Sequence, residues 1–440
     1  MKYELNQNVN LHVIPTNKYK TVRILVRFSA PLSTETNSKR ALLASLMETN
    51  TLNYPDQTSL SKKLSDLYGA SFGIGVSRNG NEHYFTLGMN IINDQLVPNG
   101  ISVLDEAVSF LKDVIFEPHI IDGVFEKETF EREKENLIEY IHSIFDDKQT
   151  HASLSLQNLF FSRSNSQKTP SFGTVEAIER ETALSIANYY GQMIAQDKID
   201  IMVIGDVAEG YVARCFNDFG FKNRSYQQES LFYTQPLQNV IQQKTEQLPV
   251  VQSKLNLAYH CDIYYYDELY FALMIFNGLF GGFPHSKLFL NVREKHSLAY
   301  YASSSIEPFR GLLTVQTGID GKNREKVLRL VNEQLKELAT GKVAEEDLEQ
   351  TKIMLINQFL LSLDNQRSVL EQTFLKIKAP QADISQEEWI NRIHAVTIDD
   401  IKSVAKRVKL QAVYFMEGEK EQWWKKFFTL RLMRQFILGF

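Results

Sequence analysis

One acidic residue flanked by hydroxyl side chains is the first feature that could do chemistry. Glu48 lies in Ser45-Leu46-Met47-Glu48-Thr49, within a segment from Ser38 to Thr49 that is predicted to be helical. Ser45 and Thr49 are four residues apart and share a helical face. The inverted zinc motif H-x-x-E-H has this spacing, with two zinc-binding His and a Glu that activates water. Here hydroxyls, which are poor zinc ligands, replace both His, so we interpret the segment as a zinc-protease motif without its ligands.

The histidines offer no clear replacement for the lost ligands. Of the nine, only His83, His142 and His151 lie near the equivalent region, and none forms an i, i+4 pair with another. His83 begins a predicted strand, where a polar role at the strand edge is expected. His142 follows Glu139 on a predicted helix, so an unusual site made by these two residues is an alternative. We predict that zinc is absent and that there is no other cofactor.

Composition argues against several classes of protein. The chain has 440 residues, 43% of them apolar, and a net charge of -5 without a basic stripe, which argues against a nucleic-acid partner. Cys215 and Cys261 are too few for a disulfide scaffold and indicate a reducing compartment. The N-terminus lacks an apolar signal region, and no apolar run approaches the ~20 residues of a membrane span. We therefore expect a cytoplasmic protein.

The two halves of the sequence repeat one order of predicted elements. Residues 103–112 and 327–336 are both helical in pattern, and a longer helix follows in each half, at 125–143 and 345–363. Each half opens with a β-patterned segment and ends with a Thr-initiated helix and an apolar strand that closes on Gly and an acid. These segments are 21–28, 182–190 and 201–206 in one half, and 254–259, 397–408 and 413–419 in the other.

This arrangement predicts an α+β fold with antiparallel sheets packed against helices. Further strands are expected near 84–90 and 311–317. We predict an N-terminal domain at 1–222, a Gln-rich linker at 223–251 and a C-terminal domain at 252–419. Two unrelated α+β domains are the alternative.

The C-terminal residues 420–440 form a basic, hydrophobic tail in which Trp423 to Phe440 has four cations and no acids. Contact with an anionic membrane surface or with a partner groove is one interpretation of this tail. A helix packed on its own domain, or sequence beyond the end of the domain, are the others.

One segment of the second half identifies a family. Residues 286–300 read S-K-L-F-L-N-V-R-E-K-H-S-L-A-Y. They resemble the S-R-L-F-x-x-x-R-E-K-x-G-L-A-Y segment in the second domain of the M16 (insulinase and pitrilysin) peptidase family, with Ser297 in place of the usual Gly. Tyr68-Gly69-Ala70 and residues 173–178 are further landmarks in the same order. The resemblance covers about 1–419 and implies two tandem homologous domains arranged as a clamshell.

The resemblance also locates the third zinc ligand of active members, a Glu on the long helix after the motif. In Glu133-Lys134-Glu135-Asn136-Leu137-Ile138-Glu139-Tyr140-Ile141, that position holds Tyr140. Glu139 is one residue earlier, which rotates its side chain by ~100° away from the site. With Ser45, Thr49 and Tyr140 at the three ligand positions, we predict that the chain alone is not an enzyme. Residues 278–284, with three glycines, are interpreted as a flexible loop or as ordinary turns.

Arg293 and Tyr300 match the pair that binds the substrate backbone in this family. An Arg fork and a Tyr hydroxyl suit an extended peptide; the alternative is that Arg293 and Glu294 cap a helix while Tyr300 packs in the core. The chain looks like the catalytically inactive branch in Gram-positive bacteria, linked by name to the 5-aminopentanol modification of elongation factor P.

The resemblance implies a non-catalytic subunit that binds peptide and pairs with an active H-x-x-E-H homologue as a heterodimer, or self-associates. A free-standing peptide-binding or scaffold protein is one alternative. A zinc peptidase with an unorthodox site is another.

Overall fold

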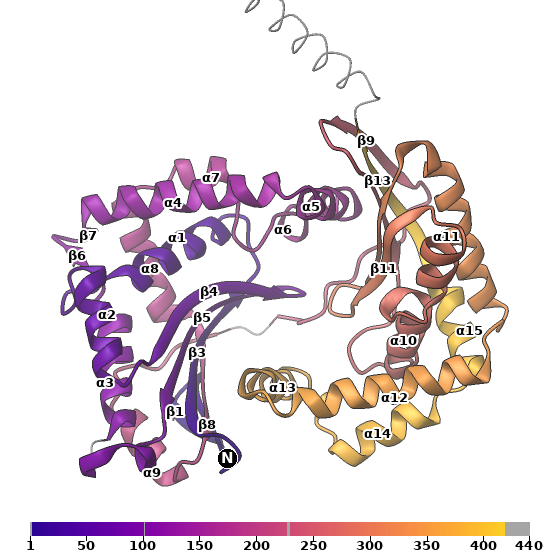
Figure 1. Cartoon of the computed structure of the whole chain (residues 1–440). Coiled ribbons are helices and arrows are strands. Elements are labelled where there is room, and N and C mark those ends of the chain that lie inside the picture. Colours follow the sequence, from indigo (N-terminus) through magenta and orange to yellow (C-terminus); the bar gives the residue numbers. More distant parts are fainter. Residues whose placement is uncertain (1, 101, 227–228, 419–440) are drawn as a thin grey trace, which may run out of the picture. The chain divides into compact units, whose positions relative to one another are not determined.

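The computed structural model describes residues 2–100, 102–226 and 229–418 (Figure 1). The tail predicted at 420–440 lies outside the described residues. The chain divides into two compact units. Unit 1 contains residues 1–146, 164–233 and 358–383, and unit 2 contains 147–163, 234–357 and 384 onward. Within the described residues, no helix combines the length and the apolar character that crossing a membrane would require.

The sheet of unit 1 has the strand order β1-β2-β8-β3-β5-β4. All neighbours are antiparallel except β2 and β8. Alternate residues of each strand face a core on one side, which β5 illustrates with Phe85, Leu87 and Met89. The strands are β1 (Lys2–Asn6), β2 (Val9–Pro15), β3 (Thr21–Pro31), β4 (Ser71–Asn79), β5 (Glu82–Ile92) and β8 (Lys198–Gly205).

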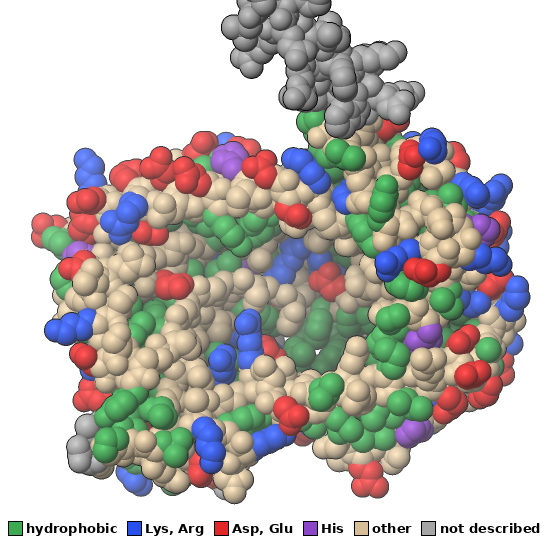
Figure 2. Space-filling model, in the orientation of Figure 1, with side chains coloured by type: hydrophobic (Ala, Val, Ile, Leu, Met, Phe, Trp, Pro, Cys, Tyr) green, Lys and Arg blue, Asp and Glu red, His purple; other side chains and the backbone are tan. Residues whose placement is uncertain are grey.

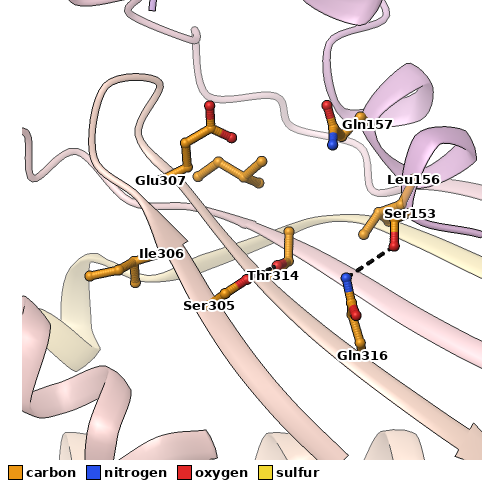
Figure 3. Close-up of a pocket in the computed structure, with 9 residues that line it drawn as sticks. Ser153, Leu156, Gln157, Ser305, Ile306, Glu307, Thr314 and Gln316 are labelled. Carbon is orange, nitrogen blue, oxygen red and sulfur yellow. Dashed lines mark hydrogen bonds between the residues drawn. The ribbon is translucent and has the colours of Figure 1, made fainter. Parts of the chain in front are cut away.

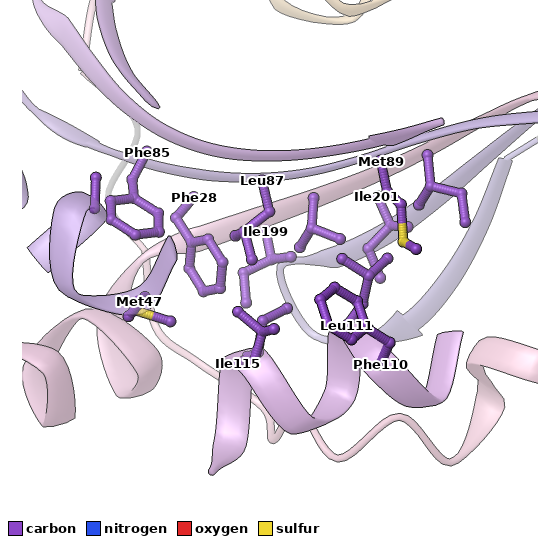
Figure 4. Packing of buried hydrophobic residues seen from close by; sticks show 14 of the residues in the cluster. Phe28, Met47, Phe85, Leu87, Met89, Phe110, Leu111, Ile115, Ile199 and Ile201 are labelled. Carbon is purple, nitrogen blue, oxygen red and sulfur yellow. The ribbon is translucent and has the colours of Figure 1, made fainter. Parts of the chain in front are cut away.

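Helices cover the core face of this sheet. Figure 4 shows Met47 of α1 and Ile115 of α3 packed beneath side chains of the sheet such as Phe28. The helices on this side are α1 (Asn37–Thr49), α2 (Gln57–Asp66), α3 (Val103–Phe116), α4 (Lys127–Asp146), α6 (Asn165–Lys168), α7 (Val175–Glu179), α8 (Ala183–Gln196) and α9 (Glu209–Asn217). Helix α13 (Gln366–Lys378) packs on the opposite face of the sheet, where its Leu370 and Phe374 meet Leu25 and Met202. Shorter elements are β6 (Ile120–Ile121), β7 (Val124–Phe125), η1 (Asp94–Leu96), η2 (Pro98–Gly100) and η6 (Pro380–Ala382).

The sheet of unit 2 has the order β11-β12-β10-β13-β9, in which only β13 and β9 pair in parallel. Its strands are β9 (Gln242–Leu248), β10 (Ser253–His260), β11 (Ala299–Glu307), β12 (Leu312–Ile319) and β13 (Lys409–Gly418). Its helices are α5 (Lys148–Phe160), α10 (Tyr270–Asn277), η3 (Gly278–Gly282), η4 (Phe289–Lys295), η5 (Gly321–Asn323), α11 (Arg324–Ala339), α12 (Glu345–Ser362), α14 (Gln386–Ala395) and α15 (Ile398–Arg407). The boundary between the units falls within α12, after residue 357.

The two sheets share one topology. The order β2-β8-β3-β5-β4 in unit 1 matches β9-β13-β10-β12-β11 in unit 2, with the parallel pair at the same place. Thr182 and Thr397 are the N-caps of α8 and α15, each in a capping box, as the sequence predicts. The predicted α+β fold is confirmed, with one parallel pair in each otherwise antiparallel sheet. The clamshell arrangement stays a prediction.

Two helices pack away from their own half of the sequence. Helix α5 follows the first sheet in sequence but contacts β9, β10 and β13 in unit 2. Helix α13 comes from the second half and contacts β8 in unit 1. Strand β9 lies inside the segment 223–251 that we predict as a linker. The sequence pattern predicts neither the packing of α5 in unit 2 nor that of α13 in unit 1, an exchange of helices between the two halves.

The glycines at 278–282 do not form a flexible loop. They lie in the π-helical segment η3, and Gly278 and Gly281 are buried. A Cβ atom at Gly281 would lie 2.6 Å from the backbone N of Ser304, which leaves no room for a side chain. The prediction of a flexible loop is therefore wrong, because the glycine at 281 permits close packing against β11.

Candidate functional site

The hydroxyls at the motif positions bond to their own helix. Leu46 and Met47 of α1 are buried in the core, while Ser45 is half-buried and Glu48 is exposed. Ser45 Oγ donates to Ala41 O at 3.4 Å, and Thr49 Oγ1 donates to Ser45 O at 2.8 Å. Both hydroxyls thus donate to carbonyls one turn back, and neither is ionised at neutral pH. They offer no charge to a divalent metal.

Glu48 contacts the outer strand of the sheet. Its Oε2 accepts the backbone N–H of Ile74 in β4 at 2.9 Å. Although Glu48 as a whole residue is exposed, desolvation of its carboxyl group beside β4 raises its pKa. The Ile74 hydrogen bond opposes that shift in pKa, and the negative charge of Glu133 on α4 adds to it. Because the outer edge of β4 has no neighbouring strand in its sheet, this bond satisfies an N–H that the ladder leaves unpaired.

The third motif position lies on α4. Tyr140 is 58% exposed and follows Glu133 by seven residues, so both lie on one helical face. Glu131, Glu135 and Glu139 are all exposed and follow one another at intervals of four residues. Figure 2 shows acidic side chains gathered along α4 and α7. Glu139 therefore belongs to a solvated acidic face of α4.

The histidines have separate roles. His83 of β5 is fully buried, and its Nε2 lies 2.8 Å from Ser171 O. Burial, with the charges of Arg40 and Arg78, lowers the pKa of His83 to about 3, so the ring stays neutral. His142 is exposed on α4. His151 belongs to unit 2, with Nε2 3.5 Å from Glu246 Oε2.

Metal ligands were sought at the motif and among all the described residues. Across the described residues there is no group of three or more His, Cys, Asp or Glu side chains that could hold a metal ion. Glu48 and Glu133 bring two carboxylates near each other without a nearby His. The donor set at the motif therefore does not fit zinc.

Arg293 lies at the surface of unit 2, on the π-helical segment η4. Its side chain is 42% exposed, with Nε 3.4 Å from Glu294 Oε1 and Cζ 4.6 Å from the centre of the Phe289 ring. Ser297, two residues after this segment, has φ = 48°, which is the left-handed region that favours glycine. This conformation explains why Gly is usual at the position in the family.

Tyr300 lies at a bulge in the outer strand of the second sheet. In the β11–β12 register, Ala299 pairs with Ile319 and Tyr301 pairs with Gly318, so Tyr300 is the extra residue. Tyr300 is 69% exposed. Tyr301 instead turns to α5, where its hydroxyl donates to Gln149 Oε1. The bulge therefore separates two adjacent tyrosines, and Tyr300 does not pack in the core.

A polar pocket of about 140 Å³ lies between α5 and the β11–β12 pair of unit 2 (Figure 3). Its hydroxyl and amide groups largely bond to one another. Gln316 Nε2 donates to Ser153 Oγ at 3.0 Å, and the hydroxyls of Ser305 and Thr314 are 2.8 Å apart. The sequence gives no signal for this pocket, because α5 comes from the other half of the chain.

Comparisons with known proteins agree with these features. The family model described as the peptidase M16 inactive domain matches residues 180–355. The "Probable inactive metalloprotease YmfF" of Bacillus subtilis (strain 168) is 32% identical over 409 residues, which cover 92% of this chain and 95% of the relative. The "Uncharacterized zinc protease YmxG" of the same strain is 23% identical and is aligned over 70% of this chain and 74% of its own length.

A solved structure described as a conserved protein from Enterococcus faecalis V583 is 57% identical, with a TM-score of 0.93. The match covers 96% of this chain and 99% of that one. The resemblance predicted from residues 286–300 is confirmed. The chain therefore belongs to the M16 peptidase family.

Proposed function

We propose that this chain is a non-catalytic M16 subunit that binds peptides and pairs with an active H-x-x-E-H homologue. The observation that carries the proposal is the exposure of Arg293 and Tyr300, in a chain whose zinc-ligand positions hold hydroxyl groups. A tyrosine 69% exposed at a strand bulge contributes little to the core, and its phenol is accessible to a ligand, which favours a role in binding. Cytoplasmic localisation is part of this proposal.

The chemistry of both residues suits an extended main chain. A guanidinium offers a fork of N–H donors for peptide carbonyls, and a phenol donates one further hydrogen bond. In unit 1, the outer edge of β4 offers main-chain groups of the same kind. Because main-chain direction alternates along a strand, Phe72 and Val76 present N–H and C=O groups to the edge that Ile74 also faces. Peptides can bind by adding a strand at such an edge.

Two observations support pairing. The relative YmxG is named a zinc protease and occurs in the same bacterium as the relative named an inactive metalloprotease. Within unit 1, the end of helix α12 also exposes two adjacent large apolar side chains, with Leu360 38% exposed and Leu361 60% exposed. Apolar side chains grouped on one exposed helix are typical of interaction surfaces. A second copy of this chain is the alternative partner.

The test measures zinc content and peptidase activity of the chain alone, and of its mixture with an H-x-x-E-H homologue from the same organism. We expect no stoichiometric zinc and no activity alone, and activity in the mixture that falls at least tenfold with Arg293→Ala. Tyr300→Phe, which removes only the hydroxyl, is expected to raise KM. Arg329→Ala, at an arginine of α11 that is 69% exposed, is the matched control and leaves activity unchanged.

The outcomes separate the candidate functions. Activity that responds equally to Arg293→Ala and Arg329→Ala would remove the proposed role of Arg293. Tight peptide binding by the chain alone, with no effect on any homologue, would favour the free-standing scaffold. Zinc-dependent cleavage by the chain alone would establish the unorthodox peptidase instead.

A further inference from the structure

Two arginines of unit 1 lack counter-ions and lie near enough for their charges to interact. They are Arg23 on β3 and Arg367 in the first turn of α13. Thr21 Oγ1 of β3 donates to Gln366 Oε1 at 3.0 Å, and Gln366 Nε2 donates to Thr21 O at 2.7 Å. Arg23 is two residues beyond Thr21 and therefore lies on the same face of β3. Arg367 directly follows Gln366 on α13. These bonds hold the first turn of α13 against β3, and the charge of Arg367 acts on Arg23.

The acidic residues near these arginines form ion pairs with other cations. Glu371, one turn along α13 from Arg367, accepts two hydrogen bonds from Arg27 at 2.5 and 2.9 Å. Asp364, just before the helix, pairs with Lys18. The first turn of α13 contains no acidic residue. Over the part of the chain that the structure describes, neither Arg23 nor Arg367 forms an ion pair or a side-chain hydrogen bond.

The Arg23 guanidinium is poorly compensated in the fold. Its Nε is buried without a hydrogen-bond partner among the described groups. Burial lowers the pKa of Arg23, and the positive charge of Arg367 lowers it further. Partly buried, unpaired like charges destabilise a fold, so proteins generally keep them where they bind an opposite charge. The free donors of both side chains point to an anionic ligand.

We propose that Arg23 and Arg367 form a carboxylate-binding site that takes an acidic group of a bound peptide. This proposal rests on the proposed peptide-binding function and adds a preference for acidic peptides. A planar guanidinium matches a carboxylate through two parallel hydrogen bonds, and two guanidiniums offset both of its oxygens. The source of the carboxylate is an Asp or Glu side chain or the peptide C-terminus.

The sheet register connects Arg23 with the outer strand of unit 1. In the sheet register, Asn90 of β5 lies across from Arg23, and Ser71 of β4 lies across from Asn90, so this row leads to the outer strand. The next pair along β5 and β4 on the same face is Gly88 and Gly73. A Cβ atom at Gly88 would lie 3.3 Å from Leu25 Cδ2, and one at Gly73 would lie 3.7 Å from Glu48 Oε1, so side chains of neighbouring residues border this pair.

The experiment compares three eight-residue peptides of one sequence: one with two Glu and an amidated C-terminus, one with Gln at both positions and an amidated C-terminus, and one with Gln and a free C-terminus. Affinities are measured for the wild type, Arg23→Gln, Arg367→Gln and the control Arg180→Gln. Arg180→Gln removes the same charge at an exposed arginine of unit 1. The wild type and the control are expected to bind the Glu peptide about tenfold more tightly than the amidated Gln peptide.

In Arg23→Gln and Arg367→Gln we expect this tenfold preference to disappear while the affinity for the amidated Gln peptide stays the same. Preference of the wild type for the free C-terminus over the amide would assign the site to the peptide end. The midpoint of thermal unfolding of Arg23→Gln is expected to equal or exceed that of the wild type, whereas a structural role for Arg23 would lower it.

Binding of the peptides without any preference for Glu or a free carboxylate would overturn the carboxylate site and leave the peptide-binding function intact. If none of the peptides binds, the proposed peptide-binding function fails, and succinate tests the arginines separately. Succinate should then raise the unfolding midpoint of the wild type and of Arg180→Gln by more than that of Arg23→Gln. Equal shifts in all three proteins would reject the site.

Discussion

Replacing His83 with Gln would test whether a neutral buried imidazole makes unit 1 sensitive to acid. His83 is fully buried in β5, and its Nε2 contacts Ser171 O at 2.8 Å. A Gln side chain places an amide N–H near the position of Nε2, so the bond to Ser171 can be kept while the titrating group is removed. A modest loss of about 1 kcal/mol at neutral pH is expected from imperfect packing.

The size of the acid-dependent loss in the free energy of unfolding follows from the shift in the pKa of His83. The pKa of His83 falls from 6.5 to about 3 on folding, so between these values the unfolded chain binds more protons than the folded one. The stability linked to His83 is therefore complete above pH 6.5 and is lost as the pH falls toward 3. A shift of this size corresponds to about 5 kcal/mol in total, of which about 2 kcal/mol is lost by pH 5.

The assay is urea unfolding followed by far-UV circular dichroism at pH 7 and pH 5. Groups that titrate equally in both proteins cancel when the wild type is compared with His83→Gln. The wild type is expected to lose about 2 kcal/mol more than the variant between the two pH values. The exposed His142→Gln is the control and should behave as the wild type. An equal loss in the wild type and His83→Gln would refute the assignment of a neutral, buried His83.

Three further substitutions test local conformation and the docking of α13. Ser297→Gly relieves a left-handed backbone conformation at φ = 48°. Because Gly loses more entropy on folding, the net gain in the free energy of unfolding, measured in urea, should be about 0.5 kcal/mol. A lower free energy of unfolding in the variant would show that Ser297 is not strained. Gly173→Ala places a Cβ 1.9 Å from Ser38 Oγ at φ = 79°, and a loss of about 3 kcal/mol or more is expected; unchanged stability would mean that the contact relaxes freely. Lys378→Met leaves Glu82 buried without its cation and should cost about 3 kcal/mol or more, while the double variant with Glu82→Gln should recover much of it; no recovery would show that the pair does not carry the loss.

Much of the fold follows from local signals in the sequence. The helices near 103–112 and 327–336 are predictable because their apolar residues recur at helical spacing, and Thr182 and Thr397 mark helix starts because their hydroxyls cap free N–H groups. Strand β9 is missed because its polar side chains are mostly exposed, so its pattern resembles a linker. It is a strand because its backbone pairs with β13, which no local pattern reveals.

The exchange of α5 and α13 could not be predicted for a related reason. Helix α13 carries several charged residues, a composition typical of a solvent-exposed helix. In the structure, however, Lys378 of α13 forms a buried ion pair with Glu82, which is 296 positions away in the sequence. Arg27 lies over the ring of Phe374 while it binds Glu371, so charged groups pack within an apolar contact. Complementarity between such distant residues is a property of the folded chain, whereas sequence periodicity describes only one helix at a time.

For the candidate site, residue identity was more predictable than geometry. The prediction of a degenerate motif at Ser45 and Thr49 needs only helical periodicity, and the structure does place both residues on one helix, α1. The exposure of Tyr300 depends on a bulge, and a bulge is set by the pairing of β11 with β12 rather than by residue types. The unpaired arginines Arg23 and Arg367 are likewise invisible in the sequence, because α13 brings them together only in the fold.

The surviving acid of the motif does not by itself argue for hydrolysis. In a zinc peptidase the metal offsets the charges of the motif, but here the negative charge of Glu133 acts on Glu48, whose pKa is raised chiefly by burial. Glu48 still accepts the N–H of Ile74 at 2.9 Å and so stabilises the outer edge of β4. This bond requires a carboxylate oxygen but no metal, which explains how Glu48 can persist where the ligands have been replaced. Tyr300 is 69% exposed and the Arg293 side chain is 42% exposed, so both are accessible for the peptide binding that we propose.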